Sequence, residues 1–128
     1  MTAIRRLGDG YEPHVDEEAG VLTYTLPVDS SFVSTVFSFR IQPEDLAVLL
    51  DDPYRRAALE VVAHTALQRS MLRDQPKVTQ ADFDALVTDV LHATPGDLET
   101  FVDRVDREHH TSTWFFMQPI LERRLGGA

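Results

Sequence analysis

The stretch VLTYTLPVDSSFVSTVFSFRI, residues 21–41, decides the fold, because its apolar side chains recur at every second position. In the first half, Tyr24 and Leu26 alternate with threonine and proline. In the second half, Phe37 and Phe39 alternate with serine. A period of two places these apolar side chains on one face of an extended strand. The stretch therefore predicts an antiparallel hairpin with one buried face.

The residues before this hairpin are mostly polar. The motifs GDG at 8–10 and DEEAG at 16–20 are typical of turns. Residues 11–15 between them allow a third strand, which Pro13 would confine to an edge of the sheet, because proline has no N–H to donate. We expect residues 1–20 to form a polar N-terminal segment with room for one short edge strand.

Helical signals follow the hairpin. In QPEDLAVLLDD, Pro43 suits the first helical position, and the two acids after it are favoured by the helix dipole. This predicts a helix at 43–51. Asp52, followed by proline, repeats the same start and predicts a longer helix from 53 to about 72.

The helix expected at 53–72 has different side chains on its two faces. Its apolar stripe, at a spacing of three and four, comprises Leu59, Val62, Ala63, Ala66, Ser70 and Met71. The opposite, polar row comprises Arg56, Glu60, His64 and Gln68. An amphipathic helix buries its apolar stripe against the rest of the fold. We therefore expect this helix to be central to the core.

Two further helices are indicated in the acidic part of the chain. Thr79 is placed to cap the first, with Asp82 as its capping-box partner, and Thr94 with Asp97 repeats the pattern for the second. Because only a short link separates them, we expect a helical hairpin over residues 79–110, with its acidic side chains on the outer faces.

The segment TSTWFFM at 111–117 leaves two structures open. Its β-branched and aromatic residues favour a strand. A helix is the alternative, although Pro119 would then lie in its interior and remove a hydrogen bond. That helix would align Trp114, Met117, Leu121 and Leu125.

Together these elements predict an α+β fold in which a small antiparallel sheet packs against three to five α-helices. A length of 128 residues fits a single domain over 1–128. The absence of cysteine excludes disulfides, thiolate zinc sites and cysteine nucleophiles. No stretch has the pattern of a membrane span or of a secretory signal, so we expect a cytoplasmic chain that does not contact membranes.

The charge of the chain is strongly negative, with 21 acidic against 12 basic residues and a net charge of -9. This composition disfavours nucleic acid as a partner. Residues 80–108 hold eight of the acids and only two arginines. As a block, this region could steer a basic protein partner.

No motif supports catalysis or cofactor binding. No serine lies in a G-x-S-x-G turn, and no glycine-rich phosphate loop is present. The adjacent residues His109 and His110 point in different directions on a helix, so a shared metal site is disfavoured, and a position near a helix C-terminus is preferred. The aspartates of DFDALVTD at 82–89 lack the glycine and glutamate of a calcium loop. We predict no catalytic residue, no metal site and no cofactor.

The run Trp114, Phe115, Phe116 and Met117 is the one cluster whose composition suits a contact surface. Four consecutive apolar residues cannot all face one side of a helix or strand. We expect the side chains of this cluster to lie in the hydrophobic core. If part of it is exposed, Trp114 or Phe115 becomes the natural anchor for a partner.

In its length, its acidity and its lack of cysteines and catalytic motifs, the chain resembles the immunity proteins that neutralise bacterial toxins. The resemblance is one of composition. It implies a protein-binding module without enzymatic activity, an inhibitor that engages a basic effector. The residues we expect at that interface are Asp82, Asp89, Asp97, Glu99, Asp103, Asp106, Trp114 and Phe115. The alternatives are a self-associating accessory subunit, which would form a homodimer, and a small ligand-binding domain or enzyme with a pocket between sheet and helices.

Overall fold

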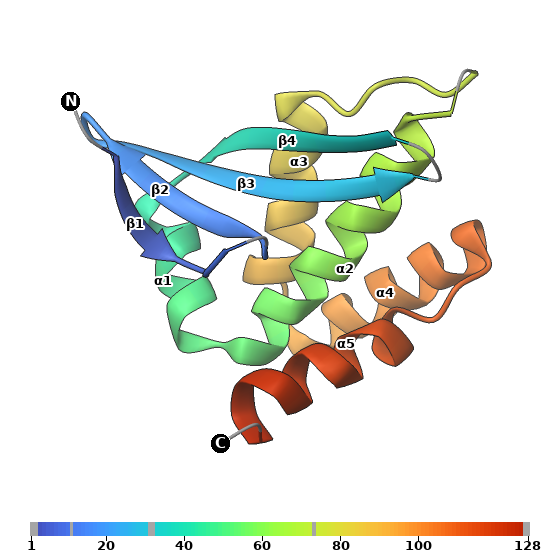
Figure 1. The fold of residues 1–128 in the computed structure, drawn as a ribbon. Helices are drawn as coiled ribbons and strands as arrows, with labels where there is room; N and C mark the ends of the chain where they lie inside the picture. The colour runs from blue at the N-terminus through green and yellow to red at the C-terminus, as the bar shows by residue number, and fades with distance from the viewer. Residues whose placement is uncertain (1–2, 11, 31–32, 73, 127–128) are drawn as a thin grey trace.

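The computed structural model describes residues 3–10, 12–30, 33–72 and 74–126, which form an α+β fold (Figure 1). The strands of its antiparallel sheet are β1 (Ile4–Leu7), β2 (His14–Glu18), β3 (Val21–Ser30) and β4 (Val33–Ile41). The α-helices are α1 (Pro43–Asp51), α2 (Pro53–Ser70), α3 (Gln80–Val87), α4 (Pro95–His109) and α5 (Thr113–Leu121). The π-helical turns η1 (Thr88–His92) and η2 (Glu122–Gly126) extend α3 and α5. The predicted fold class is confirmed. Within the described ranges, no helix combines the length and the apolarity needed to cross a bilayer.

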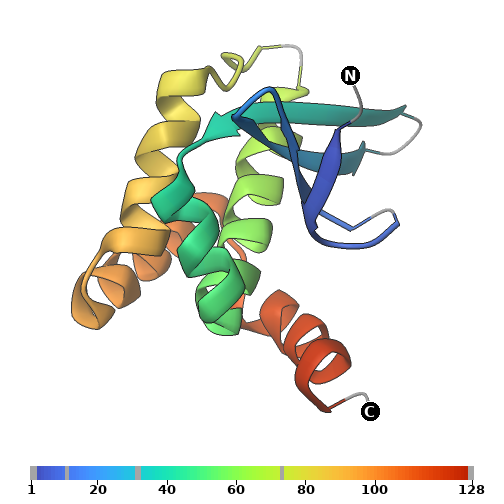
Figure 2. The same cartoon turned by 90° about the vertical axis from the view of Figure 1, so that its left-hand side faces the viewer.

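The hairpin predicted at 21–41 is formed by β3 and β4, whose register pairs Tyr24 with Phe39 and Leu26 with Phe37. Tyr24 and Leu26 are buried, whereas Val36 on the opposite face of β4 is 62% exposed. Figures 1 and 2 show the helices gathered on the buried side of the sheet. The alternation of the sequence is therefore confirmed as one covered and one solvated face.

The start of the chain differs from the prediction. Strand β2 covers 14–18 rather than 11–15, and Tyr11 lies outside the described residues. The sheet order is β1-β2-β3-β4, so β1 forms the edge and β2 is an interior strand. Pro13 lies immediately before β2, where its missing N–H costs no ladder hydrogen bond of that strand.

The acidic segment predicted as a turn at 16–20 is mostly strand, since its charges are paired across the sheet. Arg5 Nε donates to Asp16 Oδ1 at 2.7 Å, and Arg6 Nη1 lies 3.4 Å from Glu17 Oε1. The turn is confined to Ala19 and Gly20, with φ angles of 53° and 79°. Positive φ at both central residues matches the twist of a two-residue hairpin.

Helix α2 lies at the centre of the fold, as the sequence predicts. It packs against β3 and against α1, α3, α4 and α5. Every residue from Ala57 to Ala63 is buried, including Glu60, which is 4% exposed. The predicted polar row is therefore not a solvated face in this part of the helix. A helix with apolar side chains on every face has to be packed against other elements on every face.

Helix α3 closes the core beneath the sheet. Its capping box is formed as predicted, with Thr79 N donating to Asp82 Oδ2 at 2.9 Å and Asp82 N donating to Thr79 Oγ1 at 3.1 Å. Phe83 is fully buried, and its ring stacks on Phe39 with centroids 4.4 Å apart. Its centroid also lies 5.6 Å from that of Tyr24, so these three rings join α3 to the hairpin.

Helices α3 and α4 do not form the predicted helical hairpin. Helix α3 continues into η1, and α4 then turns away and packs against η1, α2 and α5 (Figures 1 and 2). The stripe of α4 that is buried in these contacts comprises Leu98, Phe101 and Val105. The expectation was wrong because the two helices meet only where α4 follows η1: α3 packs against α2 and the β-hairpin, whereas α4 also packs against α2 and α5.

The segment that the sequence left open is helix α5. Oδ1 of Asp106 accepts hydrogen bonds from Thr113 N at 2.8 Å and from Thr113 Oγ1 at 2.7 Å, and so fixes the first turn. Met117 is 1% exposed in the core, and α5 packs along α2. Pro119 does lie inside the helix and removes one backbone hydrogen bond. Packing against α2 offsets that loss.

Replacing Phe83 by alanine should destabilise the protein by about 3–5 kcal/mol, because the change leaves a cavity among buried rings. Phe115→Ala is the matched control, since Phe115 is 65% exposed and its loss should change stability by no more than about 0.5 kcal/mol. Urea denaturation of both variants measures the difference. Equal effects at the two positions would contradict this description of the core.

Candidate functional site

A network of charged side chains joins α2, the loop between β1 and β2, and η2. Arg124 donates from Nη1 and Nη2 to the two carboxylate oxygens of Glu60, at 3.0 and 2.6 Å. Arg124 Nη2 also donates to Glu12 Oε2 at 3.1 Å, and Arg56 Nη2 lies 3.5 Å from Glu12 Oε1. The side chains of Arg124 and Glu60 are only 12% and 5% exposed. The network therefore ties η2 to the central helix within the protein.

Burial dominates the ionisation of Glu60 and raises its pKa above the usual value, although the neighbouring arginines oppose the shift. Burial acts on Glu12 too, but the N–H of Asp9 and the guanidinium of Arg124 favour its carboxylate, and its pKa is lowered. Burial, reinforced by the charge of Glu60, raises the pKa of Tyr24 well above its usual value. Tyr24 is thus a neutral phenol beside this network.

This network is not predicted from the sequence, because the helical spacing places Arg56 and Glu60 on the polar face of the helix. A signal for Glu60 does exist: it is the only polar residue in AALEVVA at 57–63. A carboxylate inside an apolar stretch that covers all sides of a helix has to be buried, and burial of a charge requires a partner. That partner, Arg124, is 64 positions away, so no local pattern identifies it.

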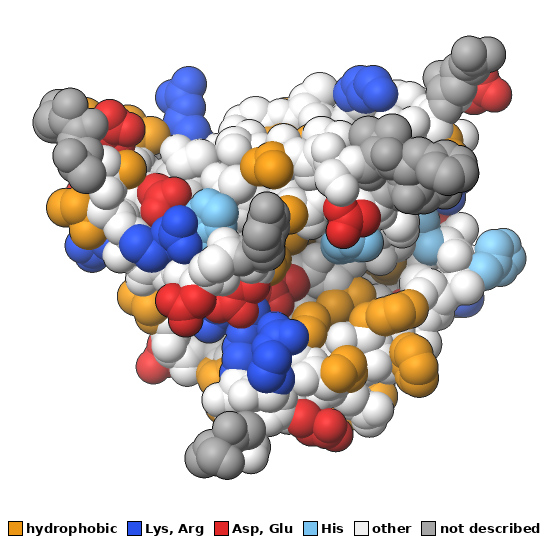
Figure 3. All heavy atoms as spheres, viewed as in Figure 1, with side chains coloured by type: hydrophobic (Ala, Val, Ile, Leu, Met, Phe, Trp, Pro, Cys, Tyr) orange, Lys and Arg blue, Asp and Glu red, His pale blue; other side chains and the backbone are white. Residues whose placement is uncertain are grey.

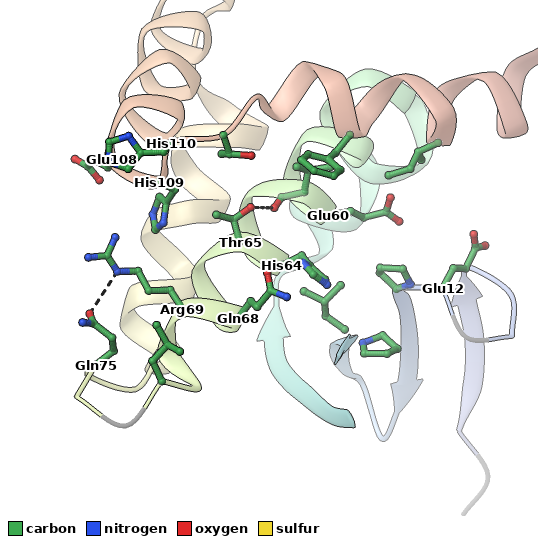
Figure 4. Close-up of a pocket in the computed structure, with 18 of the residues that line it drawn as sticks. Glu12, Glu60, His64, Thr65, Gln68, Arg69, Gln75, Glu108, His109 and His110 are labelled. Carbon is green, nitrogen blue, oxygen red and sulfur yellow. Dashed lines mark hydrogen bonds between the residues drawn. The ribbon is translucent and has the colours of Figure 1, made fainter. Parts of the chain in front are cut away.

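Beside the network, a groove of about 1280 Å³ lies between α2 and the segment that runs from the end of α4 to η2 (Figure 4). We call it the α2–α5 groove. Leu26, Pro27 and Val61 line it on the side of the sheet and α2, and Phe116 and Ile120 line it on the side of α5. Its volume is at least that of ordinary small-molecule sites, which are about 300–1000 Å³.

Polar side chains enter the α2–α5 groove from both walls. Figure 4 shows His64, Thr65 and Arg69 of α2 on one wall and His109 at the end of α4 on the other. Burial lowers the pKa of His64, and the charge of Asp29 opposes the shift only in part. His64 is therefore a neutral imidazole at neutral pH.

The two adjacent histidines lie where the sequence predicts, at the C-terminal end of α4. His109 is the last helical residue, and His110 is the C-cap, with a left-handed φ of 51°. Its backbone N–H donates to the carbonyl of Asp106, which helps to close the helix. Among the described residues, no three His, Cys, Asp or Glu side chains are arranged to hold a metal ion.

Three consecutive aromatic side chains are exposed on α5: Trp114 is 48% exposed, Phe115 65% and Phe116 51%. At about 100° per residue, Phe115 lies nearly opposite Met117, while Trp114 and Phe116 lie on either side of it, so the three rings span a wide arc of the helix. The ring centroid of Tyr54, on α2, lies 6.1 Å from that of Trp114. We call Tyr54, Trp114, Phe115 and Phe116 the aromatic surface; Figure 3 shows hydrophobic side chains gathered in the region of α5. The core interpretation is confirmed for Met117 and wrong for the three aromatic residues.

The acidic residues named from the sequence do not form one patch. Asp82 is engaged in the capping box at the start of α3, and Asp106 holds Thr113. Asp89 is half-buried in η1. Of the acids named from the sequence, Asp97, Glu99 and Asp103 are exposed on α4. The starts of α3 and α4 lie at opposite ends of the α3–η1 segment (Figure 1), so the set is divided between two parts of the surface.

No family model, no curated protein and no solved structure is significantly similar to this chain. The candidate sites are therefore the aromatic surface and the α2–α5 groove, as defined by the chain's own geometry.

Replacing Arg124 by alanine should cost about 3–5 kcal/mol of stability, because it leaves the carboxylate of Glu60 buried without its main partner. The neighbouring residue provides the control: the side chain of Arg123 is 63% exposed, and Arg123→Ala should cost at most about 1 kcal/mol. Chemical denaturation of both variants tests this. Similar losses at 123 and 124 would show that the buried pair contributes no more than an exposed one.

His64 should make stability fall as the solution is acidified. Its folded-state pKa lies below the usual 6.5, so below that pH the unfolded chain binds a proton that the folded chain does not. The contribution of neutral His64 to the free energy of unfolding is fully present above the pKa of this residue in the unfolded chain. It is lost as the pH falls toward the pKa of His64 in the folded protein. His64→Gln should therefore lose less stability than the wild type between roughly pH 7.5 and pH 5.5. An imidazole NMR titration that places the pKa of His64 at or above 6.5 would refute this.

Proposed function

We propose that this protein is a protein-binding module whose aromatic surface contacts a basic protein partner. The observation that carries the proposal is the exposure of Trp114, Phe115 and Phe116 at consecutive positions of α5, with the ring of Phe116 5.3 Å from that of Phe115 and the ring of Tyr54 6.1 Å from that of Trp114. Single exposed apolar residues are ordinary, but contiguous exposed aromatic groups are a mark of interaction sites. Tryptophan and tyrosine are also the residues that most often dominate binding energy at protein interfaces.

The charge of the protein supports a basic partner. A net charge of -9 creates a negative field that attracts basic proteins and speeds their association. On α4, which precedes the aromatic helix, Glu99 and Asp103 are exposed, and no hydrogen bond or ion pair among the described residues engages their carboxylates. In this proposal, the acids steer the encounter and the aromatic surface sets the lifetime of the complex.

The form of this function that we propose is inhibition of a basic effector, in which the aromatic surface covers a site on the effector. The compositional resemblance to immunity proteins supports this form. It requires no catalytic residue in this chain, because the inhibitor acts by occlusion.

The aromatic surface can be tested with the double variant Trp114→Ser/Phe115→Ser. Proteins captured from the host by the wild type are purified, and their affinities for each variant are measured by calorimetry. Loss of an aromatic hot spot worth about 2 kcal/mol should weaken binding about 30-fold. Val36→Ser is the control, because Val36 is 62% exposed on the solvated face of the sheet. A dimer of this chain that the double variant abolishes would instead assign the surface to self-association.

The steering role can be tested by one charge reversal. Glu99→Lys should lower the association rate and reduce its dependence on salt, because steering is screened by ions. Glu18→Lys, at the exposed end of β2, changes the net charge by the same amount and serves as the control. Equal effects of the two reversals would mean that only net charge matters, and α4 would then have no local role.

A further inference from the structure

The α2–α5 groove combines an apolar lining with cationic groups, although the protein as a whole is acidic. Its apolar part is formed by Leu26, Val61, Phe116 and Ile120. Its arginines are Arg69, Arg123 and Arg124, and its acids are Glu12, Glu60 and Glu108. Formal charges are therefore balanced along a groove in a chain whose net charge is -9, and the lining also holds three histidines.

The charges at the two ends of the groove differ in what they contact. Glu12 and Glu60 are already engaged by Arg124 and Arg56, so that end has no free carboxylate. At the other end, Arg69 makes one side-chain contact, from Nε to Gln75 Oε1 at 3.4 Å, and no ion pair of the described residues includes it. Figure 4 shows Arg69 and His109 at this same end, on facing walls, with Glu108 beside His109. A guanidinium without an acidic partner is a suitable donor for a carboxylate.

We propose that the α2–α5 groove binds an amphipathic organic acid, whose carboxylate is held by Arg69 and His109. The apolar body of the acid lies along Val61, Phe116 and Ile120. The guanidinium of Arg69 favours an anion over a cation at its own position, while the carboxylate of Glu108 at the same end of the groove opposes this preference. The groove shares Phe116 with the aromatic surface, but Val61, Arg69 and Ile120 lie outside that surface, so the two proposals can fail independently.

Dodecanoate, below its micellar concentration, is the probe, and binding is measured by calorimetry and by backbone amide NMR shifts. Dodecylammonium has the same chain with the opposite charge, and acetate supplies the head group alone. The expected result is that dodecanoate binds at least about tenfold more tightly than either, with shifts around Val61, Arg69 and Ile120. Equal affinity for dodecanoate and dodecylammonium, or no binding of dodecanoate, would overturn the proposal.

Matched variants locate the site. Arg69→Gln should weaken the binding of dodecanoate about tenfold. Arg40 is an exposed arginine on β4, so Arg40→Gln should leave the affinity unchanged.

Phe116→Ser should weaken binding because Phe116 lines the groove, while Phe115→Ser should not because Phe115 does not line it. Glu108→Gln should strengthen binding, since it removes a negative charge from the lining. If Phe115→Ser weakens binding as much as Phe116→Ser, or if the shifts centre on Trp114, the acid binds the aromatic surface and the groove is not the site.

Discussion

The burial of α2 on all sides is the constraint on which the rest of this structure depends. From Ala57 to Ala63 the helix has no solvated face, so one covering layer cannot satisfy it. The sheet covers one side, and α1, α3, α4 and α5 cover the others. Helices α3 and α4 diverge after η1, and each packs against a different part of the central helix.

The same constraint makes one ion pair essential. Glu60 is the single carboxylate in the buried part of α2, and burying it without a partner would cost several kcal/mol. Arg124 supplies two hydrogen bonds to it from η2, and Asp106 holds the other end of the segment at Thr113. With both ends attached, the rotation of α5 about its axis is fixed. Met117 then points into the core, and the three aromatic side chains before it are left in solvent.

The two candidate sites follow from that rotation. Because Phe116 lies at the border between the exposed side of α5 and the side that faces α2, it belongs to the aromatic surface and also lines the α2–α5 groove. The electrostatic character of the two sites differs. Asp97, Glu99 and Asp103 of α4 are exposed acids outside the groove, whereas the lining of the groove holds three arginines, three carboxylates and three histidines. The two proposals therefore assign a basic protein and an organic acid to different parts of one small molecule.

Much of the secondary structure is determined by the sequence alone. The period of two at 21–41 determines the hairpin and its buried face, and Pro43, Asp52, Thr79 and Thr94 mark where four helices start. These signals are local, because capping and alternation involve residues close together in the chain. The strand at 14–18 is harder to predict from the sequence. Its acidic side chains are accommodated in the sheet because Arg5 and Arg6 of β1 pair with them.

The structure of residues 113–121, the burial of Glu60 and the exposure of the aromatic side chains were determined by the tertiary structure. Each depends on a contact between residues that are distant in the sequence. Whether 113–121 became strand or helix depended on Asp106 and on packing against α2, which together offset Pro119. Whether Glu60 faced solvent or core depended on Arg124, 64 residues away. The exposure of the aromatic residues depended in turn on that pair. Local patterns report the preferences of neighbouring residues, but the side of α5 that faces solvent is set by the partner it packs against, and that partner is visible only in three dimensions.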